Sequence, residues 1–169
     1  METKVKTTVR SIFHCSLERA FKTPILCDVT RIHTGYGLMP KVTHCTEDEG
    51  WGQPGASKKV FVAKSMSQPG GWMSVDHVVE RVENRHWKIR VDQFQSWMLS
   101  FTRFEGEWHT REVAPKTIEI TYNYTMCANN PLWYPFNWLF TKTFWRIYMK
   151  RVVENVRKLT LEQAPYLYD

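Results

Sequence analysis

The feature that most constrains this sequence is one amphipathic segment near its C-terminal end, residues 131–162. Apolar side chains recur along it at spacings of three and four, which places them on one face of a helix. That face comprises Trp145, Tyr148, Val152, Val156 and Leu159. A second apolar row lies beside its first half and comprises Phe140, Phe144 and Ile147. The segment therefore predicts one long helix whose apolar face is widest at its beginning and needs a broad surface, such as a β-sheet, to cover.

The chain before this helix is predicted to form mainly β-strands. Alternation of apolar and polar residues predicts seven of them, over residues 4–13, 41–46, 58–64, 72–83, 86–94, 97–113 and 117–126. After the first strand, Ser16 is typical of a helix N-cap, and Pro24 is typical of the first turn of a helix. Two short helices are therefore expected there, over residues 17–22 and 25–32. Because short turns join consecutive strands, the sheet should be antiparallel.

This order of elements predicts the fold class. The expected structure is an α+β protein in which a curved, seven-stranded antiparallel sheet wraps around the long C-terminal helix, with two short helices after the first strand. The length of 169 residues favours a single ligand-binding domain spanning residues 1–169. A strongly curved sheet covered by one helix leaves a space between the two. The aromatic content of 14%, with eight tryptophans, favours a cavity or groove in that space.

Charge and hydropathy narrow the classes of partner. The formal charge is +6, but no cluster of five or more lysines and arginines concentrates it. Spread positive charge supports at most transient contact with anionic membranes, and we expect no nucleic-acid partner. Residues 1–6 lack the apolar stretch of a signal peptide, and the longest apolar run, 132–140, is too short to span a bilayer. These features predict a cytoplasmic protein, a monomer or a homodimer, without a transmembrane segment.

The sequence contains no familiar cofactor or nucleophile motif. The four cysteines show no CxxC spacing, and the six histidines are scattered, with no two at a metal-ligand interval on a clear element. A phosphate-binding glycine loop, a dinucleotide-binding turn and a GxSxG motif are all absent from the sequence. We therefore expect neither a metal site nor a cofactor.

The turn at residues 84–85 gives the sharpest functional prediction. Treated as a two-residue hairpin loop, it pairs Glu80 with Ile89 and Asp76 with Gln93. Paired residues share a face, so this register places both carboxyl groups on the concave, apolar side of the sheet. A carboxyl group buried there has a raised pKa and needs a partner or a ligand, which makes both residues candidates for acid–base catalysis.

Other fates remain open for these carboxyl groups. Glu80 could instead form a structural bond across the cavity with Arg103, Arg111, His109 or an aromatic hydroxyl group. A slip of one residue in the turn would move both carboxyl groups to the solvent side. Asp76 lies nearer the end of the sheet, where exposure to solvent is expected even in the predicted register.

The remaining ligand-facing positions follow from strand alternation and from the helix face. In the last hairpin either Trp108 or His109 faces inward together with Tyr122 and Tyr124, and apolarity favours Trp108. The two tyrosines would place hydroxyl groups on a mostly apolar wall, as ligand pockets commonly do. The predicted ligand-binding residues are Glu80, Trp87, Ile89, Gln93, Trp97, Phe101, Trp108, Tyr122, Tyr124, Phe144, Trp145 and Tyr148.

Several local patterns accompany this order of elements. They are Trp51-x-x-Pro54-Gly55 before a strand, Glu80-x-Val82 at the end of another, Gly106-Glu107-Trp108, and Thr117-x-Glu119-x-Thr121-Tyr122-x-Tyr124. With them and the aromatic, basic C-terminal helix, the whole chain resembles the START-like helix-grip superfamily (SRPBCC). That group includes polyketide cyclases/dehydratases, lipid-transfer domains and plant allergen-type carriers. The resemblance implies the helix-grip fold, but function only as a class, because the fold hosts carriers, receptors and enzymes.

Two functions fit these observations. The first is a carrier or sensor that binds a small hydrophobic or amphipathic molecule between the sheet and the C-terminal helix, as the aromatic richness and the lack of a catalytic motif suggest. The alternative is an enzyme of the polyketide cyclase/dehydratase type, which needs a shaped cavity and acid–base groups such as Glu80 with Asp76 or a tyrosine. A packed interaction domain without a cavity is a third interpretation.

Overall fold

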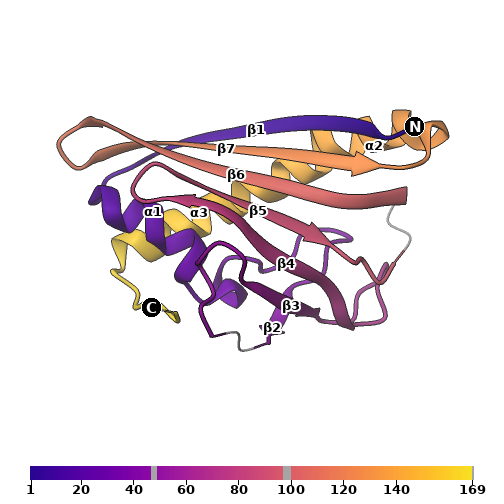
Figure 1. Cartoon of the computed structure of the whole chain (residues 1–169), viewed down its shortest axis with the longest axis horizontal. Coiled ribbons are helices and arrows are strands. Elements are labelled where there is room, and N and C mark those ends of the chain that lie inside the picture. The colour runs from indigo at the N-terminus through magenta and orange to yellow at the C-terminus, as the bar shows by residue number, and fades with distance from the viewer. Residues whose placement is uncertain (47–48, 97–99, 169) are drawn as a thin grey trace.

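A strongly curved antiparallel sheet forms one layer of the protein, and a long C-terminal helical run lies across its concave side (Figure 1). The computed structural model describes residues 1–46, 49–96 and 100–168. In this part of the chain the seven strands lie in the order β1-β7-β6-β5-β4-β3-β2, and every neighbouring pair is antiparallel. They are β1 (Thr3–Phe13), β2 (Val42–Cys45), β3 (Ser57–Val62), β4 (Gly71–Val82), β5 (His86–Asp92), β6 (Phe101–Ala114) and β7 (Thr117–Ala128). The predicted α+β class and the curved antiparallel sheet are confirmed.

The two helices after β1 are an α-helix, α1 (Leu17–Leu26), and a single 3-10 turn, η1 (Val29–Arg31). The Ser16 side chain caps α1 as predicted, because its oxygen accepts the backbone N–H of Arg19 at 3.2 Å. The predicted break at Pro24 is wrong, since α1 continues through this proline. A proline inside a helix leaves the carbonyl four residues earlier without its usual donor. Here that carbonyl, on Ala20, accepts the indole N–H of Trp108 at 3.1 Å instead.

Buried tryptophans attach α1 to the sheet and to the following loop. The indole N–H of Trp87 donates to the carbonyl of Phe21 at 3.2 Å, and that of Trp51 donates to the carbonyl of Ile25 at 2.7 Å. Together with the bond from Trp108, these contacts satisfy the one polar group of each indole while its large apolar surface is buried. The core therefore contains tryptophans that pack and also position α1.

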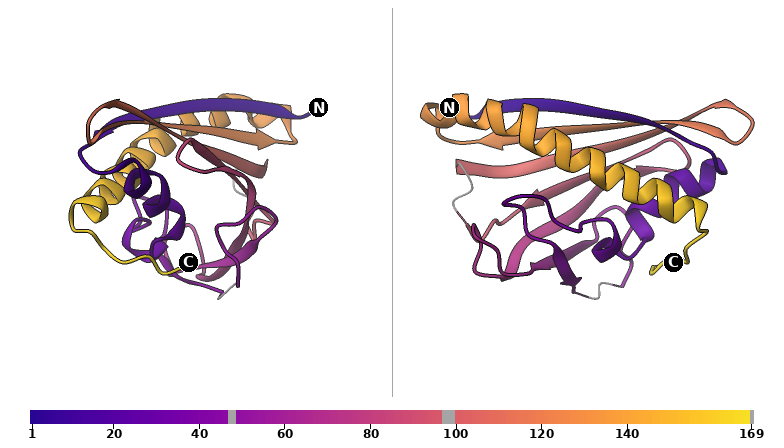
Figure 2. Two further views of the ribbon diagram at one scale, coloured as in Figure 1. Left: turned by 60° about the vertical axis from the view of Figure 1, so that its left-hand side comes forward. Right: turned by 180° about the vertical axis from the view of Figure 1, so that it is seen from behind.

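The C-terminal run is one continuous helix in its path but not in its hydrogen bonding (Figure 2). It consists of η3 (Pro131–Trp133), α2 (Tyr134–Leu139), the π-helical segment η4 (Phe140–Trp145) and α3 (Arg146–Leu161). Every residue of the predicted apolar face, from Trp145 to Leu159, is buried. The expectation that the wide first half is fully covered is wrong, because Leu132, Phe136 and Ile147 are exposed.

The register of the β4–β5 hairpin differs from the prediction. Val82 pairs with His86, so the loop has three residues, and its central residue Asn84 has a positive φ of 59°. A β-bulge at Val79 then adds one extra residue to β4. A bulge reverses the in–out alternation of the strand beyond it. The three-residue loop sends Glu80 outward, and the bulge returns Val78 and Asp76 to the inward face.

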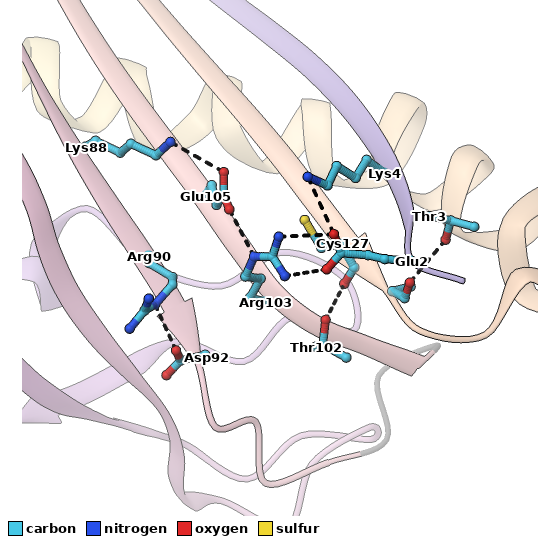
Figure 3. Close-up of polar contacts among 11 residues, drawn as sticks. Glu2, Thr3, Lys4, Lys88, Arg90, Asp92, Thr102, Arg103, Glu105 and Cys127 are labelled. Atoms are coloured by element: carbon cyan, nitrogen blue, oxygen red, sulfur yellow. Dashed lines mark hydrogen bonds and ion pairs between the residues drawn. The ribbon is translucent and has the colours of Figure 1, made fainter.

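The convex face of the sheet is covered by ion pairs (Figure 3). Arg103 lies there, where its guanidinium binds Glu2 and contacts Glu105 at 2.9 Å, and Lys88 lies 3.5 Å from the same Glu105. The pairing of β6 with β7 shifts by one residue after Phe101, which turns Arg103 away from the cavity. Partly exposed pairs of this kind contribute little to stability but keep this face hydrophilic.

None of the helices in the three described ranges is long and apolar enough to cross a lipid bilayer.

Candidate ligand-binding site

An inner cavity of about 110 Å³ lies between the concave face of the sheet and α3. Its apolar lining consists of Val29, Met39, Pro40, Val42, Val60, Val62, Met73, Ile89, Val91, Phe94, Phe104 and Trp145. Its polar lining consists of His33, Ser74, Asp76, Tyr122, Tyr124 and Tyr148. The volume is several times what one water molecule needs. A mostly apolar space with a few convergent polar groups has the composition of a small-molecule site.

The cavity continues at both ends. At one end it shares Met39, Pro40 and Met73 with a wider groove of about 550 Å³ that Phe140 and Phe144 also line. At the other end it shares Asp76 and other residues with a small pocket of about 40 Å³. The three spaces therefore adjoin one another through shared lining residues. We call the small pocket the inner end and the groove the outer end.

Asp76 is the acidic group of this cavity. It lies before the bulge on β4 and pairs with Val91, so its side chain faces inward with that of Val78. Burial raises the pKa of its carboxyl group to about 6, and the nearby charge of Lys58 partly opposes this shift. The expectation that Asp76 is exposed to solvent is wrong, because the bulge restores the inward direction that the three-residue loop would have reversed.

Three tyrosines and a histidine supply the other polar groups. Burial raises the pKa of Tyr122, Tyr124 and Tyr148, so each phenol remains protonated at neutral pH. Tyr122 and Tyr124 hydrogen-bond to each other, and the Tyr148 hydroxyl lies 2.8 Å from Nδ1 of His33. Burial, followed by the charge of Lys58, lowers the pKa of His33 to about 4, which keeps its imidazole neutral. The cavity therefore presents neutral hydroxyl and imidazole groups to a ligand.

The strand alternation of β3 brings Lys58 to the inner end of the cavity. Lys58 shares the inward face with Val60 and Val62, and it lies opposite Asp76 on β4. Only 2% of its surface is exposed, and its side chain lines the small inner pocket. The sequence contained the signal for this position, because Lys58 alternates in phase with these valines, but lysines in a strand are usually assigned to solvent.

Most of the predicted ligand-facing residues lie along the three spaces. Ile89, Tyr122, Tyr124, Trp145 and Tyr148 line the inner cavity, and Phe101 and Phe144 line the groove. Trp87 and Trp108 reach only the small inner pocket, where they pack on each other with ring centroids 5.8 Å apart. Trp108 rather than His109 faces inward, as favoured. That these residues bind a ligand remains a prediction.

Three predicted positions fall outside the cavity or outside the described residues. The inward placement of Glu80 is wrong: its carboxylate is exposed and lies 3.0 Å from Nε2 of His86 on the outer face. The inward placement of Gln93 is also wrong, because it follows β5 with a positive φ of 53° and is exposed. Trp97 lies outside the described residues. Of the alternatives left open for Glu80, the one observed is a carboxyl group on the solvent side of the sheet, and not a bond across the cavity.

The residues that the sequence analysis missed include the ionisable side chains of His33 and Lys58 and the loop residues Met39 and Pro40. His33 and Lys58 carry no motif, and only the tertiary contacts bring them to the cavity. Among the described residues, no group of three or more histidine, cysteine or acidic side chains is arranged to hold a metal ion.

Sequence comparison gives no family for this chain. No family model matches it, and no curated protein matches it.

Solved structures match it over nearly its whole length. Norcoclaurine synthase from Thalictrum flavum, in a complex with dopamine and hydroxybenzaldehyde, covers 97% of this chain and 90% of its own with a TM-score of 0.67 and 12% identity. The chain has the helix-grip fold. A protein of unknown function from Staphylococcus aureus shares this helix-grip fold over 96% of both chains, with a TM-score of 0.70 and 10% identity. Ara h 8.0201 matches 95% of this chain and 99% of its own, with a TM-score of 0.66 and 12% identity.

The predicted resemblance to helix-grip proteins is thereby confirmed at the level of the fold. Identities of 10% to 12% carry no residue roles from these helix-grip structures to this chain.

Proposed function

We propose that this protein is a carrier or sensor that binds a small hydrophobic or amphipathic molecule in the inner cavity and the adjoining groove. The observation that carries the proposal is a set of adjoining, mostly apolar spaces between the sheet and the C-terminal helical run, in which the ionisable side chains His33, Lys58 and Asp76 lie away from the groove. An apolar body would lie against Val91, Met73 and Phe104, while a polar end would lie near Asp76 and Tyr122.

The solved structures support the size class of ligand. The norcoclaurine synthase structure contains dopamine and hydroxybenzaldehyde, two small aromatic molecules, in a protein of the same fold. By this analogy of fold, the 169 residues act as one ligand-binding domain. From the sequence, we also propose a cytoplasmic location, a monomer or homodimer, and no nucleic-acid partner.

Filling the inner cavity tests this proposal. Val91 lines the cavity, and a Val91→Trp substitution adds a bulky ring inside it. We expect the affinity for anilinonaphthalene sulfonate, followed by its fluorescence on titration, to fall about tenfold or more because the substituted ring occupies the space the probe needs. Native mass spectrometry of the purified wild-type protein, followed by denaturing extraction, would also show any co-purified small molecule.

The matched control is Val79→Trp. Val79 lies on β4 at the bulge and is 46% exposed, so a ring there leaves the cavity unchanged. Equal probe binding by wild-type protein and both variants would show that the probe does not enter the cavity, and a wild-type protein that binds no apolar probe would contradict the proposal.

A second candidate function is an enzyme of the cyclase/dehydratase type. Asp76, with its pKa near 6 beside Tyr122, favours it, because general acid–base catalysis is most efficient when the pKa of the group is near the working pH. Glu80 has no part in this version, since it lies on the outer face. Its test is turnover of a linear poly-β-ketone thioester to a product lighter by one water molecule, which the carrier function does not require.

A further inference from the structure

A buried lysine, Lys58, lies at the inner end of the cavity, and the proposed function gives it no role. Lys58 is 2% exposed, and its ammonium nitrogen has no hydrogen-bond partner within the described residues. It lies 3.9 Å from the ring centroid of Trp51 and 5.3 Å from that of Tyr168. Such cation–π contacts offset part of the cost of burying a charge, but they leave the three N–H donors of the ammonium group without an acceptor. A buried charge without hydrogen bonds is costly.

Within the described ranges, no side chain or carbonyl accepts a hydrogen bond from the Lys58 ammonium group. Asp76 lies opposite Lys58 on the neighbouring strand, yet no ion pair joins the two among the described residues. The other polar groups facing this end are Tyr122 and the neutral His33, and the His33 ring is already bonded to Tyr148. The described residues therefore leave this acceptor position open to a ligand, and an anionic oxygen gives the strongest hydrogen bond to an ammonium group.

We propose that the ligand is a monocarboxylic acid with an apolar body, and that its carboxylate binds Lys58 at the inner end of the cavity. The proposal rests on the proposed function and names the chemical class of its ligand. The carboxylate supplies the acceptor that Lys58 lacks, and hydroxyl groups such as that of Tyr122 donate to its second oxygen. The apolar body then lies along Ile89 and Val91 toward the groove.

Three probes that share one alkyl chain test the class of ligand. Decanoate, decanol and decylammonium differ only in the charge and hydrogen bonding of the head group. Titration calorimetry with the wild-type protein should show decanoate binding about tenfold to a hundredfold more tightly than decanol, as expected for a charge-assisted hydrogen bond. Decylammonium should bind more weakly than decanol, because its charge meets that of Lys58. Equal affinities for decanoate and decanol would overturn the proposal.

A Lys58→Met variant tests the residue itself. Methionine keeps a flexible chain of similar length and removes the charge, so the preference for decanoate over decanol should disappear while decanol binding changes little. Lys59→Met is the control, because Lys59 is exposed on the opposite face of β3. A Lys58→Met protein that still prefers decanoate would also overturn the proposal. Thermal unfolding of both variants establishes that each is folded, and the wild-type comparison does not depend on either.

The outcomes separate the two proposals. If all three probes bind equally and the Val91→Trp variant loses them, the cavity binds ligands but Lys58 does not select acids. If none of them binds the wild-type protein, the proposed function itself fails.

The surface of η3 and α2 supports a second, independent inference. Large apolar side chains are exposed in succession along η3 and α2, and we call them the α2 surface: Leu132, Tyr134, Phe136, Trp138 and Leu139. Between 41% and 84% of each of these residues is exposed. Large aromatic and aliphatic side chains exposed in such number along one short segment mark an interaction site.

The charge around the α2 surface identifies the partner. Exposed basic residues follow it on the same helical run, at Lys142, Arg146 and Lys150. No aspartate or glutamate occurs between residues 120 and 153. A stretch of aromatic and basic side chains without acidic residues in the same segment is typical of segments that lie in the interface of an anionic membrane.

The α2 surface also lies beside the groove. Phe140 and Phe144 come after it on the same helical run and line the groove, and Leu38, which is 55% exposed, lines that groove too. We infer that the α2 surface docks on an anionic lipid bilayer, which would bring the groove close to the bilayer.

Sedimentation with vesicles tests this inference. The protein should bind vesicles of phosphatidylcholine and phosphatidylserine, and a Phe136→Ser/Trp138→Ser variant should bind about tenfold or more weakly, because it loses two apolar side chains that would enter the interface. Val79→Ser/Val113→Ser is the control, since these residues are also exposed but lie on other elements. Lys142→Gln/Arg146→Gln should reduce binding to the anionic vesicles alone. Binding that is absent, or equal for the wild-type protein and the Phe136→Ser/Trp138→Ser variant, would refute docking.

Discussion

Replacing Trp108 with alanine should lower the free energy of unfolding by about 4 kcal/mol, the cost typical of truncating a large buried aromatic side chain. Trp108 is fully buried, stacks on Trp87 and meets Phe13 edge-on with ring centroids 6.0 Å apart. The substitution also removes the indole donor from the carbonyl of Ala20, which has no helical partner because Pro24 follows four residues later. Urea unfolding at neutral pH measures the change.

Trp138→Ala is the matched control for this prediction. Trp138 is 47% exposed on α2, and truncating it should change the free energy of unfolding by less than about 1 kcal/mol. Similar losses from the two substitutions would contradict the assignment of Trp108 to the structural core.

Replacing Asp76 with asparagine should change how stability depends on pH. Burial raises the pKa of Asp76 from 3.8 to about 6, so the folded state holds this proton more tightly than the unfolded state. The stability that this group contributes is therefore fully present below about pH 4 and is lost as the pH rises to about 6. The loss amounts to roughly 3 kcal/mol, at about 1.4 kcal/mol for each tenfold change in proton affinity.

His33 titrates in the opposite sense and hides this effect in the wild-type protein. Its pKa is lowered from 6.5 to about 4, so the stability it contributes is lost as the pH falls through that range. The measurement is the difference in free energy of unfolding between Asp76→Asn and wild type. It should move by roughly 3 kcal/mol in favour of the variant between about pH 4 and pH 7. A His33→Asn/Asp76→Asn variant should remove both effects, and a difference that stays constant with pH would contradict the burial of Asp76.

The elements that the sequence predicted well are those set by local periodicity. The buried face from Trp145 to Leu159 and the alternation of β7 from Ile118 to Met126 both appear as predicted. Each depends only on residues a few positions apart. The sequence also shows that the first half of the C-terminal helix is widely apolar. This pattern does not say what covers the apolar side chains, and Phe136 and Leu139 are exposed.

The residues that decide the chemistry were predicted less well. The predicted register placed Glu80 inward, but the loop has one residue more than predicted and Glu80 faces outward. Asp76 faces the cavity only because the bulge at Val79 shifts the register a second time. Lys58 was overlooked although it lies on the same face of β3 as Val60. Lysines are rarely buried, and the strand pattern alone gives no partner that would explain its burial.

The sequence by itself determined the helix-grip fold: its element order, its antiparallel sheet and the face of α3 that packs on it. Only the tertiary structure decided which polar groups meet in the cavity, namely Lys58 and Asp76 but not Glu80. The physical reason is that periodicity within a strand is local and robust, whereas its direction relative to the cavity changes with a shift of one residue in pairing. Such shifts arise from the loop and the bulge of the assembled hairpin.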